Sequence, residues 1–251
     1  MNSRFVTRSG IVVERTLTDL DYEAGFAPLV DRLDHERGVY LSSGIEFPDR
    51  YSQWDIGVVE PPLEVVARGQ AVRFRALNER GVRLLRILRP LIAGGEGEEI
   101  TADTEAEIAL VIAGSERFFA EEDRSLQPTV FSPLRRLMAD FAGFDDGTLG
   151  LYGAFGYDLI FQFERIELSL DRGGAYPDDL HLYLSDQVHI RDRRMERSVR
   201  TDYEFARDGV TTAGAARTPF APLDAPPSEL KVGAIEADRD ADDYALMVDA
   251  A

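Results

Sequence analysis

The sequence contains no cysteine, one lysine and only three histidines, His35, His181 and His189. The absence of cysteine excludes disulfides, thiolate metal ligands and cysteine nucleophiles. His181 and His189 fall in segments predicted to be strands, and no second imidazole stands at metal-ligand spacing from either. We therefore predict no catalytic residue and no metal site based on histidine.

Long apolar runs are also absent. No run approaches the roughly 18 residues of a membrane span, and the first residues, Met1 to Phe5, lack the apolar stretch of a signal peptide. We therefore expect a cytoplasmic protein that has no membrane partner.

Positive charge is scarce. The chain has 28 Lys and Arg residues against 46 Asp and Glu residues, which gives a formal net charge of −18. The arginines are dispersed along the sequence and form no basic stripe that could neutralise phosphates. The charge therefore argues against nucleic acid as a partner.

The overall amino-acid composition is that of a globular protein. With 251 residues, of which 44% are hydrophobic, the chain can bury the core of one large domain or two small ones. Residues 5–18 predict a strand, or a short hairpin that turns at Ser9-Gly10. Alternating apolar residues in Leu180–Leu184 and Val188–Ile190 predict a hairpin that turns at Asp186-Gln187. Other predicted strands are Tyr51–Val59, Leu63–Ala67, Val72–Leu77, Ile108–Ala113, Leu149–Phe155 and Ser198–Phe205.

Three segments carry helical periodicity. Phe26, Leu29 and Leu33 form an apolar stripe in a helix that Gly38 should end, and the second helix spans Val82–Ile92. In the third, Ser132 is predicted as the N-cap and Pro133 as the first helical residue. We therefore predict an α+β fold with mostly antiparallel sheets and covering helices.

Composition also suggests how the chain is divided. Residues 1–206 carry the predicted strands and helices and form one domain. Residues 207–239, rich in Ala and Pro, predict a linker or a loop that lies along the surface. Residues 240–251 begin with acids and continue with apolar spacing typical of the first turns of a helix.

The residues contain no phosphate-binding loop, no nucleophile elbow and no dinucleotide fingerprint. The most suggestive polar segment is Ser42-Ser43-Gly44, which is followed by Arg50-Tyr51-Ser52 at the start of the next strand. Hydroxyls, backbone groups and one cation at adjoining strand ends could hold the carboxylate and ammonium of an amino acid. The alternative is an ordinary serine-rich turn.

Four segments resemble anthranilate synthase component I, especially the form fused to its glutamine amidotransferase, and they follow the order of that family. They are RGVYLSSGIEFPDRYSQWDIGVVEPPLEV from Arg37, GLYGAFGYDLIFQFE from Gly150, DDLHLYLSDQVHIRDR from Asp178 and YEFARDGVTTAG from Tyr203. The resemblance covers most of the chain and implies the fold of the family's N-terminal region, with residues 240–251 as the start of the chorismate-binding domain.

The resemblance also implies a function. The family converts chorismate to anthranilate and pyruvate with ammonia from glutamine, and tryptophan inhibits it at a site built around a Leu-Leu-Glu-Ser segment. Leu41 and Ser43 match that segment, whereas Tyr40 and Ser42 replace its first Leu and its Glu. The implied tryptophan-binding residues are Leu41, Ser42, Ser43, Arg50, Tyr51 and Ser52.

The same resemblance places the family's catalytic residues and Mg²⁺ ligands in the chorismate-binding domain. It therefore implies a lyase whose catalytic residues, metal site and Mg²⁺ cofactor are not on this chain, so that the chain alone is inactive. The implied partners are L-tryptophan, the chorismate-binding and glutamine amidotransferase domains or subunit, and further copies in a homo-oligomer. Alternatives are a stand-alone amino-acid-binding module and the related aminodeoxychorismate synthases.

Overall fold

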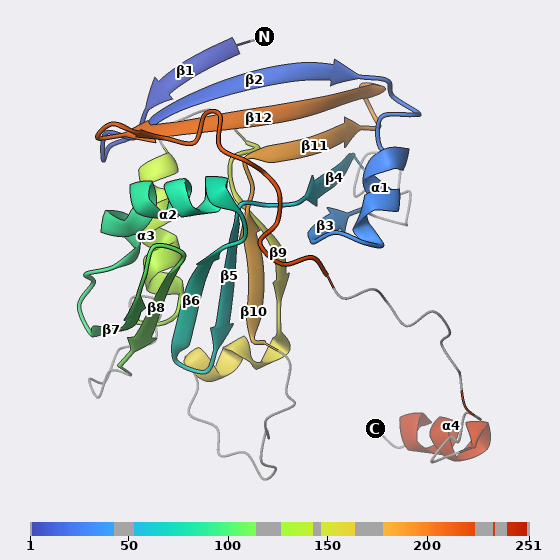
Figure 1. The fold of residues 1–251 in the computed structure, drawn as a ribbon. Coiled ribbons are helices and arrows are strands. Elements are labelled where there is room, and N and C mark those ends of the chain that lie inside the picture. The colour runs from blue at the N-terminus through green and yellow to red at the C-terminus, as the bar shows by residue number, and fades with distance from the viewer. Residues whose placement is uncertain are drawn as a thin grey trace.

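The computed structural model describes residues 2–42, 53–113, 127–142, 147–163, 178–223, 233 and 240–249. Their strands form two antiparallel sheets, and helices cover parts of each (Figure 1). The predicted α+β class, with mostly antiparallel sheets, is therefore confirmed.

The larger sheet has the strand order β1-β2-β12-β11-β4-β3, and β13 pairs with the end of β12. The predicted hairpin near the N-terminus is formed by β1 and β2, and β1 is an edge strand of this sheet. Gly10 lies in the turn between the two strands, with a φ of +87°. The bounds are β1 (Asn2–Val6), β2 (Val12–Leu20), β3 (Gly38–Leu41), β4 (Trp54–Val59), β11 (Gln187–Asp192), β12 (Arg197–Arg207) and β13 (Val210–Thr211).

The smaller sheet has the order β7-β8-β6-β5-β10-β9. Its central strand β5 carries almost only buried residues, which means that both faces of the strand are covered. The bounds are β5 (Leu63–Arg68), β6 (Ala71–Ala76), β7 (Glu98–Asp103), β8 (Glu107–Ile112), β9 (Leu151–Phe155) and β10 (Leu180–Leu184).

The helices are α1 (Ala27–Leu33), α2 (Glu79–Ile92), α3 (Phe131–Phe141), α4 (Ala241–Asp249) and the 3₁₀ helix η2 (Tyr157–Gln162). Asn78 caps α2, because its side chain accepts a hydrogen bond of 2.9 Å from the Gly81 N–H. The helix predicted near the C-terminus is confirmed as α4, all of whose residues are exposed.

Two predicted helix ends were wrong. Ser132 is not the N-cap of α3, which begins at Phe131; Thr129 Oγ1 instead accepts from the Phe131 N–H, and Ser132 Oγ accepts from the Thr129 N–H. This reciprocal pair resembles a capping box. Gly38 does not end α1, which stops at Leu33, but opens β3. A Cβ on Gly38 would lie 2.1 Å from the Val58 carbonyl oxygen, so close strand pairing requires glycine there.

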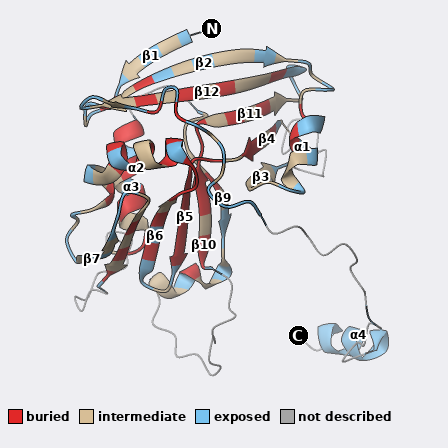
Figure 2. Ribbon diagram, viewed as in Figure 1, coloured by how far each residue is buried: buried red, intermediate tan, exposed pale blue. Residues whose placement is uncertain are grey.

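The core lies where α2 and α3 pack against the smaller sheet and continues into the larger one (Figure 2). Leu84, Leu85 and Leu88 of α2 are fully buried, and Phe141 of α3 contacts Phe205 of β12 edge to face. One hydrophobic cluster therefore joins both sheets.

The predicted hairpin of residues 180–190 was wrong. β10 pairs with β5 and β9 in the smaller sheet, whereas β11 pairs with β4 and β12 in the larger one. Between them, the buried residues Ser185 and Asp186 carry the chain from one sheet to the other. Alternation fixes which way side chains point but not which strand lies alongside, so the pattern alone could not separate a hairpin from a crossover.

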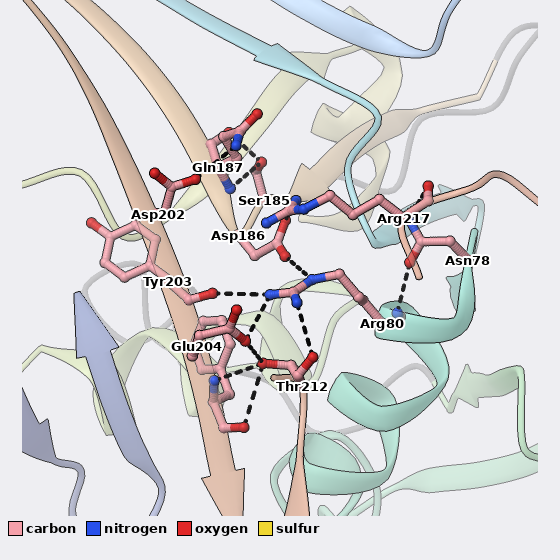
Figure 3. Close-up of polar contacts among 12 residues, drawn as sticks. Asn78, Arg80, Ser185, Asp186, Gln187, Asp202, Tyr203, Glu204, Thr212 and Arg217 are labelled. Atoms are coloured by element: carbon pink, nitrogen blue, oxygen red, sulfur yellow. Dashed lines mark hydrogen bonds and ion pairs between the residues drawn. The ribbon is translucent and has the colours of Figure 1, made fainter. Parts of the chain in front are cut away.

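A buried ion-pair network fixes this crossover (Figure 3). Arg80, at the start of α2, has a side chain only 4% exposed and pairs with Asp186, whose side chain is 2% exposed. The guanidinium also donates to the carbonyl of Thr212 at 2.9 Å and to the carboxylate of Glu204 at 2.9 Å. Arg217 binds the other oxygen of Asp186 at 2.7 Å.

The segment that follows β12 lies against the domain as far as residue 223. Thr212 is buried, and the Phe220 N–H donates to the Leu77 carbonyl at 2.9 Å. For residues 207–223 the surface loop is therefore the better of the two sequence interpretations. The proposed division at residues 206 and 239 stays a prediction.

Candidate functional site

A polar cluster lies where β3 ends and β4 and β11 meet. Its centre is Asp55, the second residue of β4, whose side chain is fully buried. Ser42, directly after β3, donates from its hydroxyl to Asp55 Oδ1 at 2.7 Å. Since β3 and β4 pair antiparallel, Leu41 lies opposite Ile56, and Ser42 comes level with Asp55.

Two arginines hold the same carboxylate. Arg193 forms a bidentate pair with Asp55, with Nη2 at 2.8 Å from Oδ1 and Nε at 3.2 Å from Oδ2, and it also donates to Ser42 Oγ at 3.1 Å. Arg191 donates from Nε to Asp55 Oδ2 at 2.7 Å. Both arginines lie at the end of β11 and just beyond it, next to β4 in the sheet.

Aromatic rings border the charges. The Arg191 guanidinium lies 5.2 Å from the centre of the Phe26 ring and 5.9 Å from that of Tyr22, within the range of cation–π contact. Tyr40 of β3 packs 6.1 Å from Phe26, centre to centre, and its hydroxyl accepts a bond from Arg191. The cluster therefore combines charges of both signs with flat apolar surface.

Burial alone would raise the pKa of Asp55, but hydrogen bonds from Arg193, Ser42 and Arg191 outweigh it and lower the pKa below the usual value. The carboxyl is thus ionised at neutral pH. Next to this cluster, burial lowers the pKa of His189 to about 4, with a smaller contribution from Arg200. His189 is therefore neutral, and its Nδ1 finds no hydrogen-bond partner among the described residues.

The structure brings together only part of the predicted site. Ser42 belongs to the cluster, and Leu41 lies beside it at the end of β3, 39% exposed. The other four predicted residues, Ser43, Arg50, Tyr51 and Ser52, lie outside the described residues. Their place in a tryptophan site stays a prediction.

Sequence reasoning missed Asp55, Arg191 and Arg193. A signal was present, because Arg191 and Arg193 are two residues apart at the end of a strand and can project to the same side. What the sequence does not show is the partner: Arg193 lies 138 positions from Asp55 in the chain.

No group of three or more His, Asp or Glu side chains among the described residues could hold a metal ion. No described helix is long and apolar enough to cross a membrane. His181, one of the three histidines of the chain, forms a hydrogen bond of 2.9 Å with the buried carboxylate of Glu64.

Comparison with known proteins identifies two relatives that are named as anthranilate synthases. No family model matches the chain. It is 42% identical over 218 residues to the anthranilate synthase of Azospirillum brasilense, a match that covers 84% of this chain but 28% of that protein. It is 23% identical over 171 residues to anthranilate synthase component 1 of Haemophilus influenzae, covering 67% of this chain and 32% of that protein. The chain is therefore homologous to anthranilate synthases over less than a third of their length.

Proposed function

We propose that this chain is the tryptophan-binding, regulatory portion of an anthranilate synthase in tryptophan biosynthesis. The observation that carries the proposal is the cluster around Asp55. It occupies the end of β3, where the tryptophan-binding segment of the family aligns with Leu41 and Ser42. The names of both relatives support the link to anthranilate synthesis.

The cluster has the chemistry that a tryptophan zwitterion needs. The ligand's carboxylate would bind at the guanidinium groups of Arg191 and Arg193, as carboxylates do at arginine pairs. Its ammonium would bind at oxygens of Asp55 and Ser42, and its indole ring would pack on aromatic side chains such as Tyr22. Ser42 is the smallest of these groups, so changing it disturbs the fold least.

Binding of L-tryptophan to the 251-residue chain, measured by titration calorimetry, tests this proposal. Ser42→Ala should weaken binding about tenfold or more, because a hydrogen bond to a charged group is worth about 1.5–3 kcal/mol. Ser43→Phe should abolish binding by filling the predicted site. Ser3→Ala is the matched control, since Ser3 also bonds an arginine, Arg15 at 3.0 Å, but at the other edge of the sheet. No binding by wild type, or equal binding by all variants, would contradict the proposal.

We infer that the conversion of chorismate and ammonia to anthranilate and pyruvate takes place in parts of the relatives that this chain does not match. With chorismate, Mg²⁺ and ammonium, the chain alone should produce no fluorescent anthranilate above the blank. Anthranilate that increases with protein concentration would show that catalytic residues lie on this chain. We further propose that the chain works with chorismate-binding and glutamine amidotransferase units, in a homo-oligomer in the cytoplasm.

A further inference from the structure

A cavity lies at the opposite end of β3 from Ser42 and the Asp55 cluster. It has a volume of about 320 Å³ and opens between the α1–β3 turn, the β4–β5 turn and residues 218–223. Its walls are mostly apolar, and the apolar lining residues are Pro61, Leu77, Pro219, Ala221, Pro222 and Leu223. This volume falls in the range of small-molecule sites, which are largely apolar with a few polar groups.

One wall of the cavity is a strap, residues 217–223, which is tied to the body of the domain. The Phe220 N–H donates to the Leu77 carbonyl, and the Asn78 amide donates to the Arg217 carbonyl at 3.3 Å. The side chain of Arg217 reaches the buried Asp186 at 2.7 Å. The strap is thus held at its start and in its middle, so the cavity is preformed.

The carboxylates that line the cavity have a cation as their partner, whereas the arginine that lines it binds a backbone carbonyl. Glu36 and Glu60 are both bound by Arg32, with N–O distances of 2.8 Å to each carboxylate. Hydrogen bonding to Glu36 is the main reason that the pKa of Arg32 is raised. The two carboxylates of the cavity therefore share one cation, Arg32, which holds both in place.

Arg37 lines the cavity, whereas Arg32 does not, and the contacts of the two arginines differ. Its Nη1 donates to the carbonyl of Ala221 at 2.7 Å, and no carboxylate of a described residue forms an ion pair with it. A guanidinium has five N–H donors, and a carbonyl oxygen carries no full charge to balance it. An apolar cavity with such a cation at its wall is complementary to a carboxylate that bears an apolar body.

We propose that this cavity binds a small organic carboxylate, with the carboxylate on Arg37 and its flat apolar body between Pro61, Leu77 and the strap. This inference does not depend on the proposed function. Arg37 precedes β3, whereas Ser42 follows it, so the two sites lie at opposite ends of the strand. Loss of one site would leave the other intact.

A matched pair of probes tests the proposal. 3-Phenylpropionate and its neutral amide, 3-phenylpropanamide, have the same shape and differ in charge. Both are titrated against the 251-residue chain by ligand-observed NMR in about 150 mM salt, which screens the chain's negative charge beyond roughly 8 Å. Wild type should bind the carboxylate about tenfold or more tightly than the amide.

Variants locate the binding. Arg37→Gln should remove the preference for the carboxylate, and Arg37→Lys should keep part of it. Arg83→Gln is the control: Arg83 also donates to backbone carbonyls, those of Thr211 and Ala213 just before the strap, but does not line the cavity. Circular dichroism checks that each variant is folded. Three results would each overturn the proposal: equal binding of the carboxylate and the amide by wild type, an unchanged preference for the carboxylate in Arg37→Gln, or an equal loss of that preference in Arg83→Gln.

Discussion

Replacing Arg80 by methionine should destabilise the fold, because its guanidinium is buried in an ion-pair network. The methionine fills much of the same space but removes the guanidinium that joins Asp186, Glu204 and two backbone carbonyls (Figure 3). Removing one partner of a buried ion pair costs about 3–5 kcal/mol, because the other charge is left without compensation. Here Asp186 keeps Arg217 as a partner, so we expect a loss near the lower end, about 3 kcal/mol.

The assay is urea unfolding of the 251-residue chain, followed by circular dichroism. Arg83→Met serves as the control, because Arg83 lies one turn along α2 and is 36% exposed in an i, i+4 pair with Glu79. Such surface pairs are worth at most about 1 kcal/mol. In the double variant Arg80→Met/Asp186→Asn the loss should be smaller than the sum of the two single losses, since the buried charge disappears with its partner. If Arg80→Met costs no more than Arg83→Met, the network does not stabilise the joint between the sheets.

Two further predictions concern single residues. The pKa of His189 is about 4 in the fold against 6.5 when unfolded, so between these pH values the imidazole is protonated in the unfolded chain but not in the folded one. The free energy of unfolding should therefore be highest above pH 6.5 and fall by at most about 3 kcal/mol as the pH drops toward 4. His189→Leu should remove that slope in urea unfolding at pH 7.5, 6 and 5, and an unchanged slope would mean that another group titrates. Gly81→Ala should cost about 2 kcal/mol or more, because the new Cβ would lie 1.9 Å from the Pro62 carbonyl oxygen. Gly147→Ala, where no atom of the described residues lies within 4 Å of the new Cβ, should be nearly neutral, and similar midpoints for both alanine variants would refute the clash.

Local patterns in the sequence determined most elements of the fold. The β1–β2 hairpin follows from two apolar segments around Ser9-Gly10, and α2 follows from its apolar residues between Val82 and Ile92. Such features depend on residues a few positions apart, and their physics is local. The resemblance to anthranilate synthases likewise came from short segments in order, and Leu41 and Ser42 were singled out in the same way.

Only the tertiary structure decided which distant segments meet. It separated β10 from β11 into two sheets, although their alternation is that of a hairpin, because pairing depends on all neighbouring strands at once. It placed Arg193 on Asp55 and Arg217 on Asp186, partners 138 and 31 positions apart. An arginine in a sequence carries no mark of the carboxylate it will bind, because burial and strand pairing select that partner from the 46 acids of the chain.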